Sequence, residues 1–118
     1  MKTAKLKRLI SIEVDLETYW PDDLECFGLW LDAEIGLSDT AGADIFRIFI
    51  CTPDWLKKRL PSEKIMLGRY LMIVSEYDLD AIIIFINQYI EKCDGEDWVS
   101  IANKLSRVWQ WEFEDYKP

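Results

Sequence analysis

Histidine is absent from this chain of 118 residues, and cysteine is scarce. Without histidine the chain lacks the commonest general base at neutral pH and the commonest zinc ligand. The three cysteines, Cys26, Cys51 and Cys93, are widely spaced with no CxxC motif. Neither a disulfide framework nor a cysteine-based zinc site is therefore expected. Each cysteine falls in an apolar pattern, which favours buried free thiols in a reducing cytosol.

Long hydrophobic runs are also missing. The most apolar run, residues 81–86, is too short to span a bilayer. The apolar run after the basic start of the chain is too short for the core of a signal peptide. With 50% hydrophobic residues, the chain nevertheless has ample apolar mass for a folded core. We expect a single soluble, cytoplasmic domain over residues 1–118.

Basic residues are missing from residues 9–46, while the whole chain carries a formal net charge of -8. The acidic residues of this stretch are Glu13, Asp15, Glu17, Asp22, Asp23, Glu25, Asp32, Glu34, Asp39 and Asp44. Nucleic acid and anionic lipid are not expected as partners, since both attract positive charge. The stretch is either an ordinary soluble surface or an electronegative face for a basic protein partner, whose association such a face accelerates.

Residues 26–36 alternate strictly in polarity, which predicts a strand with one buried face. The apolar face consists of Phe27, Leu29, Leu31, Ala33 and Ile35. The opposite face places the Trp30 indole beside Asp32 and Glu34. An indole beside two carboxylates is the first indication of a binding surface in this chain.

The same kind of pattern predicts the other elements. Strands are expected at residues 4–14, 44–51 and 68–74, and helices at residues 53–60, at residues 79–93 and from about residue 96. Pro61 is expected to end the first helix. Ile84 and Phe85 widen the apolar stripe of the second, which predicts burial on more than one side. Arg47 is expected to pair with Asp32 or Glu34 on the neighbouring strand.

The predicted order of elements is β-β-β-α-β-α-α. Consecutive strands joined by short loops pair antiparallel, and the helices then cover the sheet. We therefore predict an α+β fold, a four-stranded, mainly antiparallel sheet with helices packed on one face.

Two aromatic residues, Tyr19 and Trp20, stand inside the polar connection between the first two strands. A tryptophan in a loop usually folds back onto the core. The alternative is an exposed aromatic residue that meets a partner.

Catalytic patterns have little support. The five glycines are scattered, so no loop is built to hold phosphate. Residues 94–97 lack the alternating ligand spacing of a calcium loop. Carboxylate pairs of the glycosidase kind are expected by chance among 22 acidic residues. We expect no catalytic residue, no cofactor and no metal site.

Several stretches together resemble the immunity protein 8 family of bacterial polymorphic toxin and contact-dependent growth inhibition systems. They are DLETYWP at 15–21, CFGLWL at 26–31 with IG at 35–36, FICTPDWL at 49–56, GRYLMIV at 68–74, LSR at 105–107 and WEFEDY at 111–116. The resemblance covers nearly all of the chain. It implies a non-enzymatic, cytoplasmic antidote that binds a cognate toxin domain, in many cases a nuclease with a basic cleft.

The charge pattern, rather than the resemblance, selects the expected toxin-binding residues. They are Asp15, Glu17, Tyr19, Asp22, Asp23, Glu25, Asp32 and Glu34, with Glu112, Glu114 and Asp115 of the C-terminal tail as a second group. The main alternative is an adaptor or subunit domain that pairs with a permanent partner through a tryptophan-rich surface. An acid-based hydrolase is a third. A homodimer formed through a sheet edge also stays open.

Overall fold

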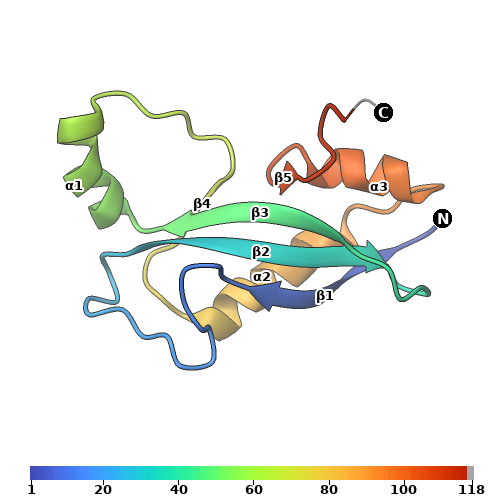
Figure 1. The fold of residues 1–118 in the computed structure, drawn as a ribbon, viewed down its shortest axis with the longest axis horizontal. Helices are drawn as coiled ribbons and strands as arrows, with labels where there is room; N and C mark the ends of the chain where they lie inside the picture. The colour runs from blue at the N-terminus through green and yellow to red at the C-terminus, as the bar shows by residue number, and fades with distance from the viewer. Residues whose placement is uncertain (117–118) are drawn as a thin grey trace.

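The computed structural model describes residues 1–116 and has the predicted α+β architecture (Figure 1). The elements are β1 (Ala4–Ile10), β2 (Gly28–Leu37), β3 (Asp44–Cys51), α1 (Pro53–Glu63), β4 (Leu71–Ile73), α2 (Leu79–Glu91), α3 (Trp98–Leu105) and β5 (Gln110–Trp111). All seven predicted elements are present in the predicted order, and β5 is an addition.

The sheet has the strand order β1-β2-β3-β4. The pairs β1–β2 and β2–β3 are antiparallel. β4 runs parallel to β3. After β3 ends, α1 and the segment that follows it return the chain alongside the second half of β3, so the two strands run in the same direction. β5 pairs antiparallel with the first half of β3, on the length of edge that β4 leaves free. Two residues are too few to show any alternation, which is why the sequence did not predict β5.

The core lies between one face of the sheet and the two later helices. The predicted apolar face of β2 is buried throughout. Ile82, Ile86 and Ile90 of α2 pack against it, together with Ile101 and Leu105 of α3. Figure 1 shows α2 and α3 alongside the sheet and α1 beyond its end. No residue of α1 is buried, so this helix adds little to the core.

Two predicted features of the helices are wrong. Pro61 does not end α1, which continues to Glu63. The helix is exposed, so water can satisfy the carbonyl group that proline leaves without a donor. Ile84 and Phe85 are not buried either: their exposed fractions are 57% and 56%. The stripe of α2 that meets the sheet is narrower than its apolar sequence.

The helices do not all pack on one face as predicted, because aromatic rings hold α1 to the outer face of the sheet, opposite the core. The ring centroids of Phe49 and Trp55 are 4.9 Å apart, as are those of Phe49 and Trp30. Gly28 makes room for this packing. A Cβ atom at that position would lie 2.6 Å from Cε2 of Trp55, which is closer than any real contact.

The three cysteines are free thiols. Cys51 and Cys93 are buried, as predicted, whereas Cys26 is half-buried. Burial raises the pKa of the Cys51 thiol and the Cys93 thiol, so both stay protonated at neutral pH.

Arg47 pairs with Asp32 across β2 and β3, as expected. The Nε atom of Arg47 donates to Oδ1 of Asp32 at 2.9 Å, and Nη2 donates to Oδ2 at 3.4 Å. This hydrogen bond and the charge of Asp32 raise the pKa of Arg47. Asp32 is buried, and in the described part of the chain its charge is compensated by the Arg47 guanidinium.

We expect Arg47→Met to lower the free energy of unfolding by about 1–3 kcal/mol, because it leaves the buried Asp32 carboxylate without its donor. Arg8→Met is the matched control. Arg8 meets Glu34 at 3.7 Å on the same face of the sheet, but its side chain is largely exposed. Its loss should change stability by less than about 1 kcal/mol. Urea denaturation measures both values, and equal effects would contradict this account.

Candidate functional site

The connection between β1 and β2, residues 11–27, is acidic and largely exposed. The predicted residues Asp15, Glu17, Asp22, Asp23 and Glu25 are all exposed on it. Two of them also shape its backbone. Asp15 Oδ1 accepts from the Glu17 N–H at 3.0 Å, and Asp23 Oδ1 accepts from the Glu25 N–H at 2.9 Å. Such turns keep the loop compact and its remaining carboxylate oxygens directed to solvent.

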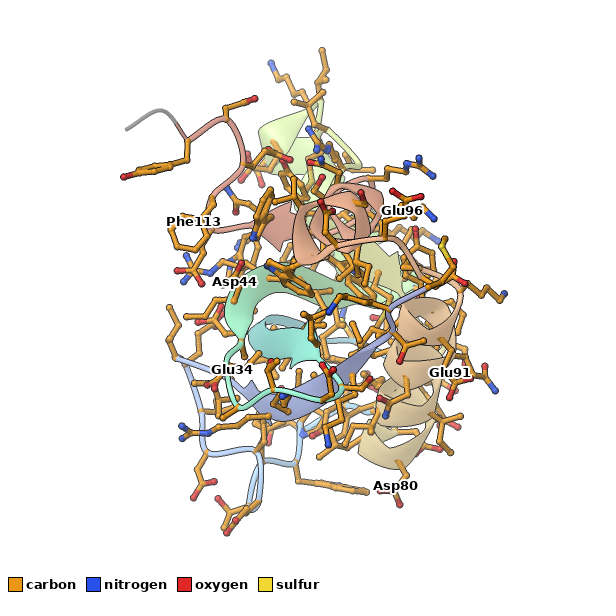
Figure 2. The ribbon with its side chains drawn as sticks, turned by 90° about the vertical axis from the view of Figure 1, so that its right-hand side faces the viewer. Glu34, Asp44, Asp80, Glu91, Glu96 and Phe113 are labelled. Carbon is orange, nitrogen blue, oxygen red and sulfur yellow. The ribbon has the colours of Figure 1, made fainter. Side chains whose placement is uncertain are left out.

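This loop meets the segment before α2, and the two enclose a shallow hollow of about 480 Å³. We call it the acidic hollow. Its lining residues are Leu16, Glu17, Tyr19, Trp20, Leu24, Glu76, Tyr77, Asp78, Leu79 and Asp80. In Figure 2, Asp80 stands at the end of α2 that lies nearest this loop. Residues about 60 positions apart in the chain therefore form one surface.

Tyr77 joins the two walls of the acidic hollow. Its backbone N–H donates to the Leu24 carbonyl at 2.8 Å. Its ring is buried, and Tyr19 and Phe27 each pack against it edge to face, with centroids 5.2 Å away. Edge-to-face pairs of this kind stabilise beyond the area they bury. The walls are thus fixed to each other through a packed aromatic cluster.

Trp20 stays exposed at the rim of the acidic hollow. Its ring approaches the Tyr77 ring only at 6.0 Å, and 69% of the residue is accessible to solvent. The expectation that a loop tryptophan folds back onto the core is wrong here. Tyr19 and Phe27 already cover the ring that Trp20 would have packed against. An exposed tryptophan among carboxylates fits the alternative interpretation, an aromatic contact for a partner.

All the charged residues that line the acidic hollow are acidic. Glu17 lies on the loop wall, and Glu76, Asp78 and Asp80 lie on the helix wall, with no Lys or Arg among the lining residues. One oxygen of Asp78 accepts from the Ala81 N–H at 3.1 Å and so caps α2. Burial, and then the charges of Glu13 and Asp22, raise the pKa of Tyr19, which therefore stays a neutral hydrogen-bond donor.

The remaining predicted residues lie elsewhere. Asp32 and Glu34 project from the outer face of β2, and Figure 2 shows Glu34 on the side of the sheet away from α2. Glu112 accepts from the Ile45 N–H at the edge of β3. Glu114 accepts from Arg69 at 2.5 Å and from the Tyr70 hydroxyl at 2.7 Å. Of the three predicted tail residues Glu112, Glu114 and Asp115, only Asp115 is exposed with no hydrogen bond or ion pair of its side chain found in residues 1–116.

Sequence reasoning missed the helix wall of the acidic hollow. The sequence predicted a helix from residue 79 and gave no binding role to Glu76, Asp78 or Asp80. Their alternation as Glu76-Tyr77-Asp78-Leu79-Asp80 was a usable signal of a second acidic segment. Nothing in the sequence, however, places this segment beside residues 15–25, because the contact depends on the tertiary fold.

Within residues 1–116, no three histidine, cysteine or carboxylate side chains gather in a way that could hold a metal ion. None of the helices in this part of the chain is both long and apolar enough to cross a membrane. What the acidic hollow offers chemically is recognition. Carboxylates beside exposed aromatic rings bind guanidinium and ammonium groups by ion pairing and by cation–π contact.

A family model described as immunity protein 8 matches residues 4–116. No curated protein and no solved structure matches the chain. The match spans almost the whole sequence and confirms the resemblance found in residues 15–21 and in the stretches that follow. The chain therefore belongs to the immunity protein 8 family.

Proposed function

We propose that this protein binds and neutralises a cognate toxin domain, acting in the cytoplasm through the acidic hollow and the exposed carboxylates of residues 15–25 beside it. Membership of an immunity protein family implies a binding protein, and such families are generally non-enzymatic. The observation that carries the choice of surface is the exposed Trp20 set among Glu17, Glu76 and Asp80, with no base among the lining residues.

The chemistry of this surface favours a basic partner. Long-range attraction between opposite charges raises association rates, and aromatic anchors slow dissociation. Enzymes that bind nucleic acid carry basic clefts, because they must neutralise phosphate groups. A nuclease domain is therefore the class of toxin that the acidic hollow fits best. Covering such a cleft with carboxylates would exclude the substrate that the toxin attacks.

One observation favours the adaptor alternative. Ile65 and Leu67, in the segment between α1 and β4, are largely exposed. Apolar side chains so exposed suit a permanent partner that covers them. An adaptor interface of this kind would be mainly apolar and insensitive to salt, whereas the acidic hollow predicts a salt-sensitive complex.

The first test is co-expression with the C-terminal domain of the protein encoded immediately upstream. We expect cells to die when that domain is made alone, and to survive when this chain is made with it. The two should then co-purify. Survival with a complex that persists unchanged at high salt would move the interface to apolar residues. No toxicity and no complex would overturn the proposed function.

The second test reverses charge in the loop wall. The side chains of Glu17 and Asp22 are exposed and make no hydrogen bond or ion pair found in residues 1–116. We expect the double variant Glu17→Lys/Asp22→Lys to slow association with the toxin domain about tenfold at low salt. The matched control is Glu91→Lys/Glu96→Lys, which changes the net charge equally at exposed positions far from the acidic hollow. Stopped-flow kinetics at two salt concentrations measure the association rate of each variant. If both variants slow association equally, the acidic hollow is not the interface.

The third test removes the aromatic contact. We expect Trp20→Ala to weaken the complex ten- to a hundredfold, or about 1.4–2.7 kcal/mol. Because the side chain is largely exposed, the free energy of unfolding should change by no more than about 0.5 kcal/mol. Ile12→Ala is the control, since Ile12 is exposed on the same loop but does not line the acidic hollow. Isothermal titration measures both affinities, and an unchanged affinity for Trp20→Ala would remove Trp20 from the interface.

A further inference from the structure

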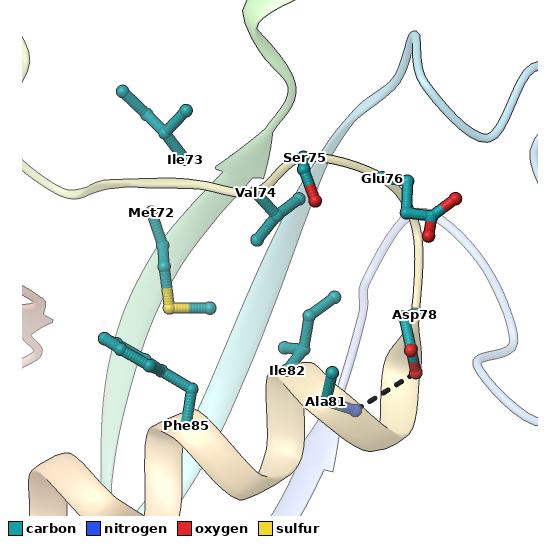
Figure 3. Close-up of a pocket in the computed structure, with 9 residues that line it drawn as sticks. All are labelled: Met72, Ile73, Val74, Ser75, Glu76, Asp78, Ala81, Ile82 and Phe85. Atoms are coloured by element: carbon teal, nitrogen blue, oxygen red, sulfur yellow. Dashed lines mark hydrogen bonds between the residues drawn. The ribbon is translucent and has the colours of Figure 1, made fainter.

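A second hollow adjoins the acidic hollow on the other side of residues 75–78 and lies between β4 and α2 (Figure 3). We call it the β4–α2 groove. Its volume is about 300 Å³. Met72 and Val74 form its strand side, and Ile82 and Phe85 its helix side. Glu76 and Asp78 line both hollows, so the two hollows share one acidic boundary.

The apolar residues of this groove are unusually accessible. Phe85 is 56% exposed, and Ile73 on the strand above it is 58% exposed. Figure 3 shows Met72 and Phe85 approaching each other across one end of the groove, with the acidic residues at the other end. A large aromatic residue exposed beside a thioether offers an adaptable site for an apolar side chain.

The backbone of β4 is also open on this side. The Tyr70 carbonyl accepts from the Phe49 N–H, and the Val74 N–H donates to the Cys51 carbonyl, each at 2.9 Å. Both residues therefore face β3. Because successive residues of a strand direct their backbone groups to opposite edges, the N–H and C=O of Ile73 face away from β3. No other strand in residues 1–116 pairs with this edge.

We propose that an extended segment of the toxin pairs with the open edge of β4 and places an apolar side chain in the β4–α2 groove. This inference rests on the proposed function and names the form of the partner. The open edge supplies backbone hydrogen bonds, and the groove selects a side chain. The negative charge of Glu76 and Asp78 favours a basic residue near the apolar anchor in the toxin segment. A Lys or Arg two positions away lies on the same face of the segment and reaches Glu76 and Asp78.

A second copy of this chain is a poorer occupant of the same edge. Pairing two β4 strands about a twofold axis would bring the Glu76 and Asp78 carboxylates of both copies to one interface. Like charges at close range oppose that arrangement. A basic segment with one apolar anchor meets no such repulsion, so the charge at the groove favours the toxin over self-association.

The test compares two neighbouring residues of α2. Phe85 lines the groove, whereas Ile84 does not, and their exposed fractions are 56% and 57%. In the complex with the toxin domain, Phe85→Lys should weaken binding at least tenfold, and Ile84→Lys by less than twofold. Circular dichroism and thermal unfolding confirm that both variants fold. Both changes add the same charge, so a difference between their affinities for the toxin domain shows that the groove takes part in binding.

A second measurement keeps the inference testable if Phe85→Lys unfolds. Hydrogen exchange of the Ile73 amide in the wild-type chain should slow at least tenfold when the toxin domain is bound. If exchange of this amide is unchanged in the wild-type complex, or if both lysine variants bind the toxin domain equally, the groove proposal is wrong and the proposed function stands. A wild-type chain that forms no complex overturns both. Dimerisation of the chain alone, with Ile73 protected in the dimer, would assign the edge to a second copy instead.

Discussion

The register between β2 and β3 is the constraint on which the rest of the structure depends. One face of each strand is buried, so a shift of β3 by one residue relative to β2 would bring Ile48 to the outer face and Arg47 into the core. The Asp32–Arg47 pair lies on the opposite, outer face of the same two strands. It forms only in the observed register, where these two residues stand directly opposite.

Many of the carboxylates of this acidic chain serve the fold rather than the surface. Asp44 shows this most clearly, because one of its oxygens accepts from the Trp98 indole at 2.7 Å and from the Trp111 indole at 3.0 Å. Glu112 and Glu114 bind the same end of the molecule to β3 and to residues 69–70. The acidic hollow stands apart because its carboxylates gather without a base among them.

The sequence predicted most of the fold because the strands and two of the helices have strong polarity patterns. β3 was predicted to the residue, and the buried face of β2 follows its alternation. What failed depended on contacts between distant segments. The apolar sequence of α2 does not reveal that only one stripe meets the sheet, which leaves Phe85 exposed. Likewise, the acidic residues of the loop were predicted as a surface, but its pairing with Glu76 and Asp80 follows from where Tyr77 packs.

The attachment of the acidic loop to Tyr77 has a consequence for how such a protein can diversify. The loop is held in place by a backbone hydrogen bond and an aromatic cluster. The side chains of Glu17, Asp22 and Glu25 on its outer side are exposed and make no hydrogen bond or ion pair found in residues 1–116. Substitutions at those outer positions change stability little. The pattern of charge on the loop can therefore be rewritten without disturbing the sheet. Under the proposed function, one scaffold could then recognise different toxins, because the residues proposed for recognition are separate from those that hold the fold together.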